Sequence, residues 1–137
     1  MNTYVLDASA LLTSILTKKS EAEEVLSDLF EKQAKGECEI YTIPLFYYEF
    51  GNGLRYSLKD QKLIEEVMDR LSQLEIKVFT LNETAIQAAI ILATRQNTTV
   101  YDTSYHLAAI LLKGTMLTCD KKYYHHAEDK TTIQLLG

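Results

Sequence analysis

Four carboxylic acids stand out because each lies inside, or at the end of, a strongly apolar segment. They are Asp7, Glu49, Asp102 and Asp120. A carboxylate beside apolar surface loses hydration, so it is expected to be paired, protonated or bound to a cation. Because carboxylate oxygens are the ligands that hard cations prefer, the set predicts a site for Mg²⁺ or Mn²⁺.

Each acid taken alone also has an ordinary structural interpretation. Asp7 and Asp102 precede helical patterns and are suited to cap them. Asp120 has the position of a turn residue before Lys121. Glu49 lies among aromatic residues, where it would otherwise face solvent or pair with a base. The functional interpretation therefore depends on the four acids meeting in the folded chain.

The hydropathy pattern alternates short strands with helices and predicts the elements that must position these acids. Strands are expected at 4–6, 40–42, 77–79, 115–118 and 132–135, and helices at 9–16, 20–36, 44–56, 59–74, 82–96 and 103–112. This alternation indicates a three-layer α/β/α domain around a central, mostly parallel sheet of short strands. Sites in such folds form at the carboxyl ends of the strands, where Asp7 and Asp120 are expected to lie.

Length and composition limit the class of protein. The 137 residues suit a single domain, 1–137, and the net charge of −5 argues against a general electrostatic grip on nucleic acid. Cys38 and Cys119 are too few for a disulfide framework, which favours a reducing compartment. No apolar segment approaches the ~20 residues that span a bilayer, so a cytoplasmic protein without a membrane partner is expected.

Four segments that contain the acids resemble, in order, the four motifs of the PIN-domain nucleases, above all the VapC-type toxins of toxin–antitoxin pairs. The segments are Val5–Leu12, Tyr48–Arg55, Val100–Ala109 and Leu117–Lys122. One such motif alone would be weak, but four in order on matching elements are considerably more specific. The resemblance covers almost the whole chain.

This resemblance implies an endoribonuclease that depends on Mg²⁺ or Mn²⁺ and cleaves RNA with water activated by the metal. The four acids match the metal-binding positions of the family. Ser9 and Thr118 match hydroxyl positions that orient carboxylates or metal-bound water, although they would also suit a helix cap and a strand. Arg55 and Lys121 are candidates for contacts to substrate phosphate, or for ordinary surface pairing.

The resemblance also implies protein partners, namely a second copy in a homodimer and an antitoxin that inserts an Arg or Lys among the acids. One departure concerns the metal. Many relatives carry a further acid soon after the fourth motif, whereas here none follows Asp120 until Glu128. The number of bound ions is therefore left open.

Two other functions compete with RNA cleavage. In the first, an aspartyl-phosphate phosphatase, Asp7 would be the nucleophile, but Ser9 stands where that family needs a second acid. The second is a PIN fold that binds RNA or protein without catalysis, which has little reason to keep all four acids. Among the histidines, His106 is expected to pack in a helix, and the adjacent His125 and His126 are expected to be exposed.

Overall fold

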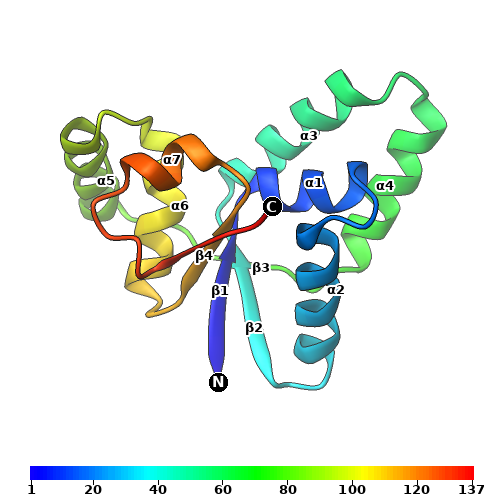
Figure 1. Cartoon of the computed structure of the whole chain (residues 1–137), viewed down its shortest axis with the longest axis horizontal. Helices are drawn as coiled ribbons and strands as arrows, with labels where there is room; N and C mark the ends of the chain where they lie inside the picture. Colours follow the sequence, from blue (N-terminus) through cyan, green and yellow to red (C-terminus); the bar gives the residue numbers. More distant parts are fainter.

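The computed structural model describes the whole chain, residues 1–137. Its centre is a five-stranded sheet with the strand order β3-β2-β1-β4-β5, in which all neighbouring strands run parallel (Figure 1). The strands are β1 (Asn2–Leu6), β2 (Cys38–Thr42), β3 (Lys77–Val78), β4 (Thr115–Thr118) and β5 (Ile133–Leu135). The five expected strands are confirmed, and the sheet is entirely parallel.

Seven helices connect the strands. They are α1 (Ala8–Leu16), α2 (Glu21–Ala34), α3 (Leu45–Ser57), α4 (Gln61–Gln73), α5 (Glu83–Gln96), α6 (Val100–Leu111) and α7 (Lys121–His126). Figure 1 shows the sheet between two groups of helices, with α5, α6 and α7 to the left and α1 to α4 to the right. The predicted three-layer α/β/α fold is therefore confirmed. None of the helices combines the length and the hydropathy needed to span a bilayer.

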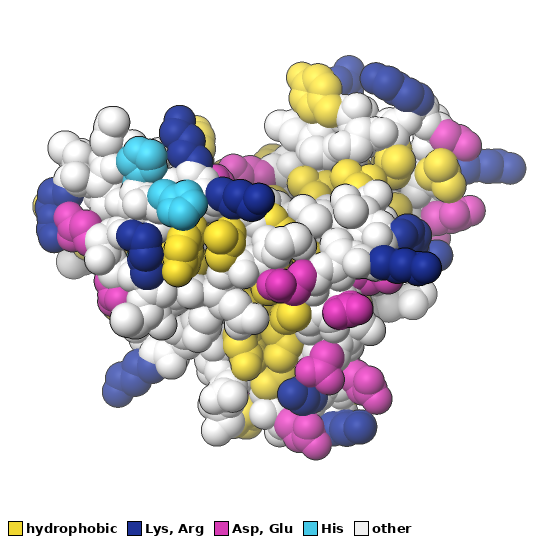
Figure 2. Space-filling model, in the orientation of Figure 1, with side chains coloured by type: hydrophobic (Ala, Val, Ile, Leu, Met, Phe, Trp, Pro, Cys, Tyr) yellow, Lys and Arg dark blue, Asp and Glu magenta, His cyan; other side chains and the backbone are white.

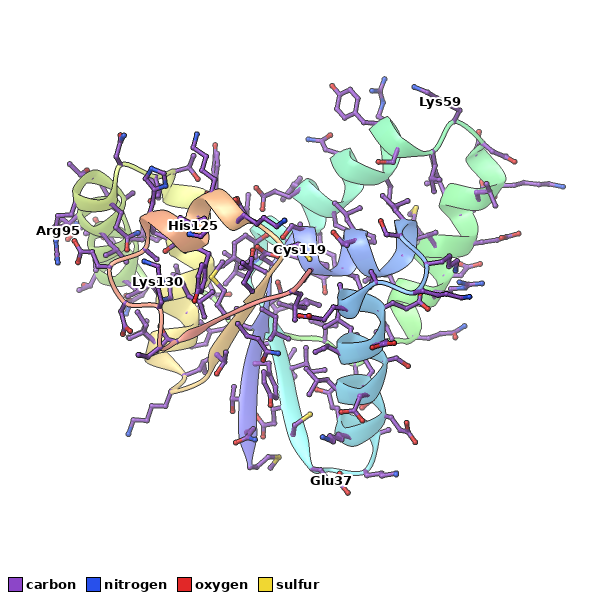
Figure 3. All side chains as sticks on the ribbon, in the orientation of Figure 1. Glu37, Lys59, Arg95, Cys119, His125 and Lys130 are labelled. Atoms are coloured by element: carbon purple, nitrogen blue, oxygen red, sulfur yellow. The ribbon has the colours of Figure 1, made fainter.

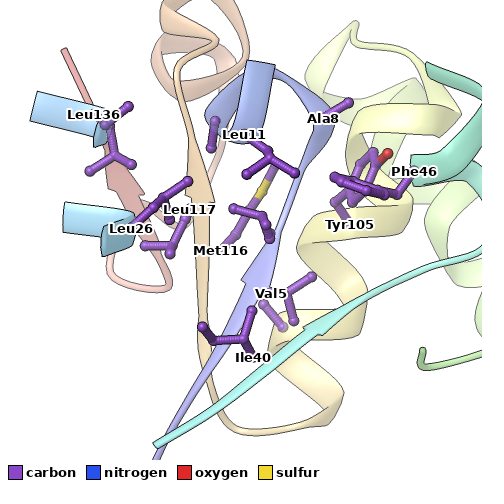
Figure 4. Close-up of a cluster of buried hydrophobic side chains, with 14 of the residues drawn as sticks. Val5, Ala8, Leu11, Leu26, Ile40, Phe46, Tyr105, Met116, Leu117 and Leu136 are labelled. Atoms are coloured by element: carbon purple, nitrogen blue, oxygen red, sulfur yellow. The ribbon is translucent and has the colours of Figure 1, made fainter. Parts of the chain in front are cut away.

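The three central strands, β2, β1 and β4, carry the core that holds this arrangement together. Val5 of β1, Ile40 of β2 and Met116 and Leu117 of β4 have no exposed surface, and they lie together in Figure 4. Each side chain of this size contributes roughly 1.5–3 kcal/mol when it is fully buried. Strands that are apolar on both faces are typical of parallel sheets covered by helices on both sides.

The register of the central strands brings two of the acids to one edge of the sheet. Leu6 of β1 is paired with Leu117 of β4, so the residues that follow the two strands are neighbours. The backbone N–H of Asp7 continues this pairing and donates to the carbonyl of Leu117 at 3.2 Å. Asp7 and Asp120 therefore leave the sheet at the same carboxyl edge, as the strand pattern predicts.

The helix starts differ from expectation at one of the acids. Asp7 caps α1, as expected, by accepting from the N–H of Ala10, and Asn82 caps α5 by accepting from the N–H of Ala85. The expectation that Asp102 caps a helix beginning at 103 is wrong, because α6 begins at Val100. Thr99 is the N-cap, and its hydroxyl oxygen accepts from the backbone N–H of Asp102 at 3.2 Å. Asp102 thus lies in the first turn of α6, with its carboxylate free of the capping role.

The short helix α7 was not predicted. Its six residues are too few to show an apolar period, and only Tyr123 among them is buried. Asp120 caps this helix by accepting from the N–H of Tyr123 at 3.0 Å, and so it is more than a turn residue. The helix starts directly beside the sheet edge where Asp7 lies.

Candidate functional site

Asp7 is held rigidly at the end of β1. The residue is only 4 % exposed, and its Oδ1 accepts from the hydroxyl of Ser9 at 2.7 Å and from the N–H of Ala10 at 3.0 Å. Its Oδ2 accepts from the hydroxyl of Thr118. A carboxylate has about four lone-pair positions, so three of them are used and one, on Oδ2, is left for a ligand.

Burial raises the pKa of Asp7 to about 6, from an ordinary value of 3.8. The hydrogen bonds from Thr118, Ser9 and Ala10 favour the ionised form and limit the rise, while the charge of Asp102 adds to it. The fold therefore keeps a carboxylate that is costly to ionise in a place that could have been apolar. Such a group is typical of functional sites.

Ser9 and Thr118 join the two loops that carry Asp7 and Asp120. The hydroxyl of Ser9, which donates to Asp7, accepts from the N–H of Cys119 at 2.9 Å and lies 3.3 Å from the hydroxyl of Thr118. The hydroxyl of Thr118 also accepts from the N–H of Asp120 at 3.0 Å. The two hydroxyl residues thus orient the acids from behind, which is the role that the sequence suggests for them.

The charge of Asp102 interacts with the charges of the other acids. Its pKa is raised to about 6, first by burial and then by the charges of Asp120 and Glu49, and its own charge raises the pKa of Asp7. The hydroxyl of Thr99 donates to its Oδ2 at 3.1 Å and acts in the opposite direction. Asp102 is therefore the acid that lies within range of the charges of the other three.

Glu49 reaches the set from the other group of helices. Its helix α3 packs closely against α1 at Gly53, one turn further on, where a Cβ atom would lie 2.3 Å from Cδ1 of Leu12. A larger side chain at Gly53 would have to displace the end of the Leu12 side chain. Across the site, the hydroxyl of Tyr105 in α6 donates to Oε1 of Glu49 at 2.7 Å.

An open, polar hollow of about 440 Å³ lies beside Asp102 and Asp120. Its lining consists of Asn97, Thr98, Thr99, Asp102, Asp120, Lys122 and Tyr123. Figure 2 shows acidic side chains in the recess between the two groups of helices, and basic and His side chains on the surface near α7. Acids below and bases on the rim suit a ligand that carries both phosphate and a cation.

The two predicted phosphate contacts lie differently from the acids. Lys121 is exposed at the first position of α7, but it does not line the hollow, whereas its neighbour Lys122 does. Arg55 is exposed in the last turn of α3, with its guanidinium 5.7 Å from the ring centre of Tyr56. Six residues of helix separate Arg55 from Glu49 by ~9 Å along the axis and turn it to another side.

Three residues of the site were missed from the sequence. Lys122 was seen only as part of a basic pair, because the direction of each lysine depends on where α7 begins. Thr99 could have been found, since a Thr three residues before an acid is a known helix-start signal. Tyr105 could have been suspected from its place one turn after Asp102, but its partner Glu49 is 56 residues away in sequence.

The other residues considered for a catalytic or metal-binding role, the histidines and Glu128, lie outside the acid set. His106 is 1 % exposed and packs in α6, with Nδ1 2.7 Å from the hydroxyl of Tyr123 and Nε2 2.6 Å from that of Thr132. His125 and His126 are exposed, and Figure 3 places His125 on α7. Glu128, the next acid after Asp120, is paired with Arg95 of α5 and does not extend the acid set.

The four acids offer the oxygen donors that a divalent cation needs. No three Asp, Glu, His or Cys side chains converge closely enough in this conformation to hold a metal ion. The donors nevertheless have the chemistry of a hard-cation site, with oxygen ligands only and two carboxyl groups whose pKa is raised by burial and further by neighbouring acids. The residues therefore fit Mg²⁺ or Mn²⁺ in the chemistry of their donors.

The family of the chain follows from a comparison with known proteins. The model of the PIN domain family matches residues 4–129, so the chain belongs to this family of nucleases. No curated protein matches the sequence of this chain.

Three solved structures share the fold at low sequence identity. PAE2754 from Pyrobaculum aerophilum is 20% identical, with a TM-score of 0.61 over 93% of this chain and 86% of its own. VapBC2 from Rickettsia felis bound to a DNA fragment from its promoter is 14% identical, with a TM-score of 0.70 over 98% and 99%. A toxin–antitoxin complex from Klebsiella pneumoniae is 12% identical, with a TM-score of 0.64 over 96% and 95%.

Proposed function

We propose that this chain is an endoribonuclease that depends on Mg²⁺ or Mn²⁺ and acts as the toxin of a toxin–antitoxin pair. The observation that carries the proposal is the set formed by Asp7, Glu49, Asp102 and Asp120 at one edge of a PIN-domain sheet. Burial, together with the charges of neighbouring acids, raises the pKa of Asp7 and Asp102, and a bound cation would lower both again. A bound divalent cation would activate water and neutralise charge on the phosphate.

The chain's own residues divide the remaining work. Asp7 is buried and fixed by Ser9 and Thr118, so it supplies a ligand of constant position. Asp102 and Asp120 border the polar hollow, where the scissile phosphate would enter. Lys122 on the rim of that hollow would bind a phosphate oxygen, with Lys121 and Arg55 as more distant contacts to the RNA backbone.

The competing functions are less well supported by the site. An aspartyl-phosphate enzyme needs an open carboxylate as nucleophile. Asp7 is 4 % exposed and accepts three hydrogen bonds, which leaves little room for attack on phosphorus. A binding protein without catalysis would keep no advantage from four mutually repelling acids, because such repulsion lowers stability when no cation is bound.

The partners follow from the toxin proposal. Two of the three similar structures are complexes of toxin and antitoxin. An antitoxin that inserts an Arg or Lys between Asp102 and Glu49 would replace the cation's charge and so inhibit the enzyme. Ile86, Ile90 and Ile91 of α5 are 43%, 46% and 59% exposed, which supports a second protein surface such as that of a homodimer.

The function is tested with purified protein and a labelled, structured RNA. Cleavage should require Mg²⁺ or Mn²⁺ and stop with EDTA, and the products should be the same at every effective metal concentration. A phosphatase would instead release phosphate from a small aryl phosphate and form an acid-stable adduct on Asp7. Formation of that adduct without any cleavage of the RNA would favour the phosphatase. RNA binding without cleavage would favour the binding protein.

A further inference from the structure

We propose that Tyr105 is a positioning residue of the acid site, whose hydroxyl holds the carboxylate of Glu49 in place to share a ligand with Asp102. This inference rests on the proposed function, because it assigns one part of the same site. It concerns a residue that touches neither substrate nor metal and acts through Glu49 alone.

The geometry begins on α6. Tyr105 follows Asp102 by three residues, so the two side chains lie on the same side of the helix, one turn apart. The ring of Tyr105 is 1 % exposed and belongs to the core cluster, where Figure 4 draws it near Phe46 of α3. The tyrosine is therefore a rigid arm that starts from the same helix as one acid and ends at another, Glu49.

The contact at the end of this arm is directed. The hydroxyl of Tyr105 donates to Oε1 of Glu49 at 2.7 Å, and Oε2 of Glu49 has no hydrogen-bond partner in the chain. One oxygen is thus held by the protein while the other is left for a ligand. Asp7 differs, because both of its oxygens accept hydrogen bonds and only one lone-pair position, on Oδ2, is left.

The hydrogen bond opposes two effects that would otherwise move Glu49 away. Glu49 carries the same charge as Asp102 and repels it across the site. Glu49 also lies on a partly exposed part of α3, beside Tyr48, which is 76% exposed. A flexible glutamate in this position would turn to solvent without a donor on the opposite helix. A buried phenol that donates to a carboxylate supplies both the direction and the stabilisation of the charge.

The substitution that tests the inference is Tyr105→Phe, which keeps the ring in the core and removes only the hydroxyl. The dissociation constant for Mn²⁺, measured by calorimetry without RNA, should rise about tenfold, as is usual when a hydrogen bond to a metal ligand is lost. Tyr41→Phe is the matched control, because the hydroxyl of Tyr41 pairs with Glu39, a carboxylate outside the acid set. This control should bind Mn²⁺ as the wild type does.

A double-mutant cycle separates positioning from a general loss of packing. In the Glu49→Ala background, which lacks any acceptor for the hydroxyl, the further change Tyr105→Phe should weaken Mn²⁺ binding no more, since its only route of action has been removed. Fluorotyrosine at position 105 gives a second readout that does not need the Phe variant to fold. Its ¹⁹F resonance should shift on addition of Mg²⁺ when Glu49 is present and stay unchanged with Glu49→Ala.

The outcomes distinguish this inference from the proposed function. If Tyr105→Phe binds Mn²⁺ as tightly as the wild type does, the proposed role of Tyr105 is overturned and the nuclease assignment is left intact. Equal losses in Tyr105→Phe with and without Glu49→Ala would make the tyrosine a packing residue only, which also overturns the inference. A wild type that binds no divalent cation would overturn both proposals.

Discussion

The hydroxyl of Thr118 donates a hydrogen bond to Oδ2 of Asp7, although 111 residues separate the two in sequence. The bond joins the carboxyl ends of β4 and β1, the two neighbouring strands at the centre of the sheet. It also lowers the pKa of Asp7, against the larger effect of burial. One contact therefore closes the sheet edge and keeps the most buried acid of the site closer to its ionised form.

The first prediction concerns this contact. Thr118→Val keeps the shape of the side chain and removes the donor, so the pKa of Asp7 should rise further above its value of about 6. At pH 7.5 the free energy of unfolding should fall by about 2 kcal/mol, the usual effect of a lost hydrogen bond to a charged group. At pH 5 Asp7 is largely protonated and the loss should be smaller. Urea unfolding at both pH values measures the difference.

Thr115→Val is the control for this prediction, because Thr115 lies in the same strand and its hydroxyl forms no hydrogen bond to another side chain. Its effect on stability should be small and equal at the two pH values. A loss in Thr118→Val that did not depend on pH would mean that the hydroxyl stabilises the strand and not the carboxylate.

The second prediction concerns the stability of Asp102→Asn without metal. The pKa of Asp102 is raised to about 6, so the native state binds the proton more tightly than the unfolded state does. Its unfavourable contribution is therefore present above pH 6 and is relieved as the pH falls towards 4. After allowance for its partial exposure to solvent, Asp102→Asn should stabilise the protein by ~1 kcal/mol at pH 7.5 and by almost nothing at pH 4.5.

The comparison must be made between variants and not on the wild type alone. Burial lowers the pKa of His106, so protonation of this ring on acidification lowers the stability of the protein. This effect is opposite in sign to that of the acids. His106 is present in both proteins, and its contribution cancels. Asp69→Asn, an exposed change of equal charge on α4, is the control and should leave stability unchanged. Stabilisation by Asp102→Asn that was equal at both pH values would exclude relief of charge repulsion.

The third prediction joins the same variant to metal binding. Added Mg²⁺ or Mn²⁺ should raise the melting temperature of the wild type, because the ion binds only the native state. The rise should be clearly smaller in Asp102→Asn, which has lost one ligand. Thermal melts of both proteins, with and without the metal, make the comparison. Equal shifts would place Asp102 outside the ion site.

The features of this structure that could be predicted from the sequence are those that local residue patterns determine. The strands before Asp7 and Asp120 are short apolar runs, and their parallel pairing brings both acids to the same edge. The capping of α1 by Asp7 and of α5 by Asn82 follows from side-chain chemistry within three residues. Predictions from such local patterns are reliable because the hydrogen bonds concerned form within a single turn of the chain.

The part that could not be predicted depends on distant contacts. The direction of Glu49 is set by Tyr105 on α6 and by the close packing of Gly53 on Leu12, and no local pattern contains these partners. The choice between Lys121 and Lys122 at the hollow depends on α7, whose six residues are too short to read as a helix. The four acids could be named from sequence, but their orientation could not.

The fourth prediction tests the contact between the hollow and RNA. Lys122→Ala should weaken RNA binding and reduce the slope of log Kd against log salt by about 1, as expected for one lost phosphate contact. Lys121→Ala and Arg55→Ala should have smaller effects, and Lys113→Ala, which lies after α6, should have none. Fluorescence anisotropy with a labelled RNA in EDTA measures binding without cleavage. A larger effect for Lys121 than for Lys122 would contradict the orientation of α7.

The central claim is that the four acids act together to cleave RNA with a divalent cation. The most direct test is the single-turnover cleavage rate of a labelled RNA in Mn²⁺, measured for the wild type, Asp7→Asn, Glu49→Gln, Asp102→Asn, Asp120→Asn and the control Asp69→Asn. Each of the four site variants should fold and lose about 100-fold or more in rate, as when a group that stabilises transition-state charge is removed. The control should cleave as the wild type does. Cleavage at the wild-type rate by Asp7→Asn and Asp102→Asn, or cleavage that persists in EDTA, would contradict the account.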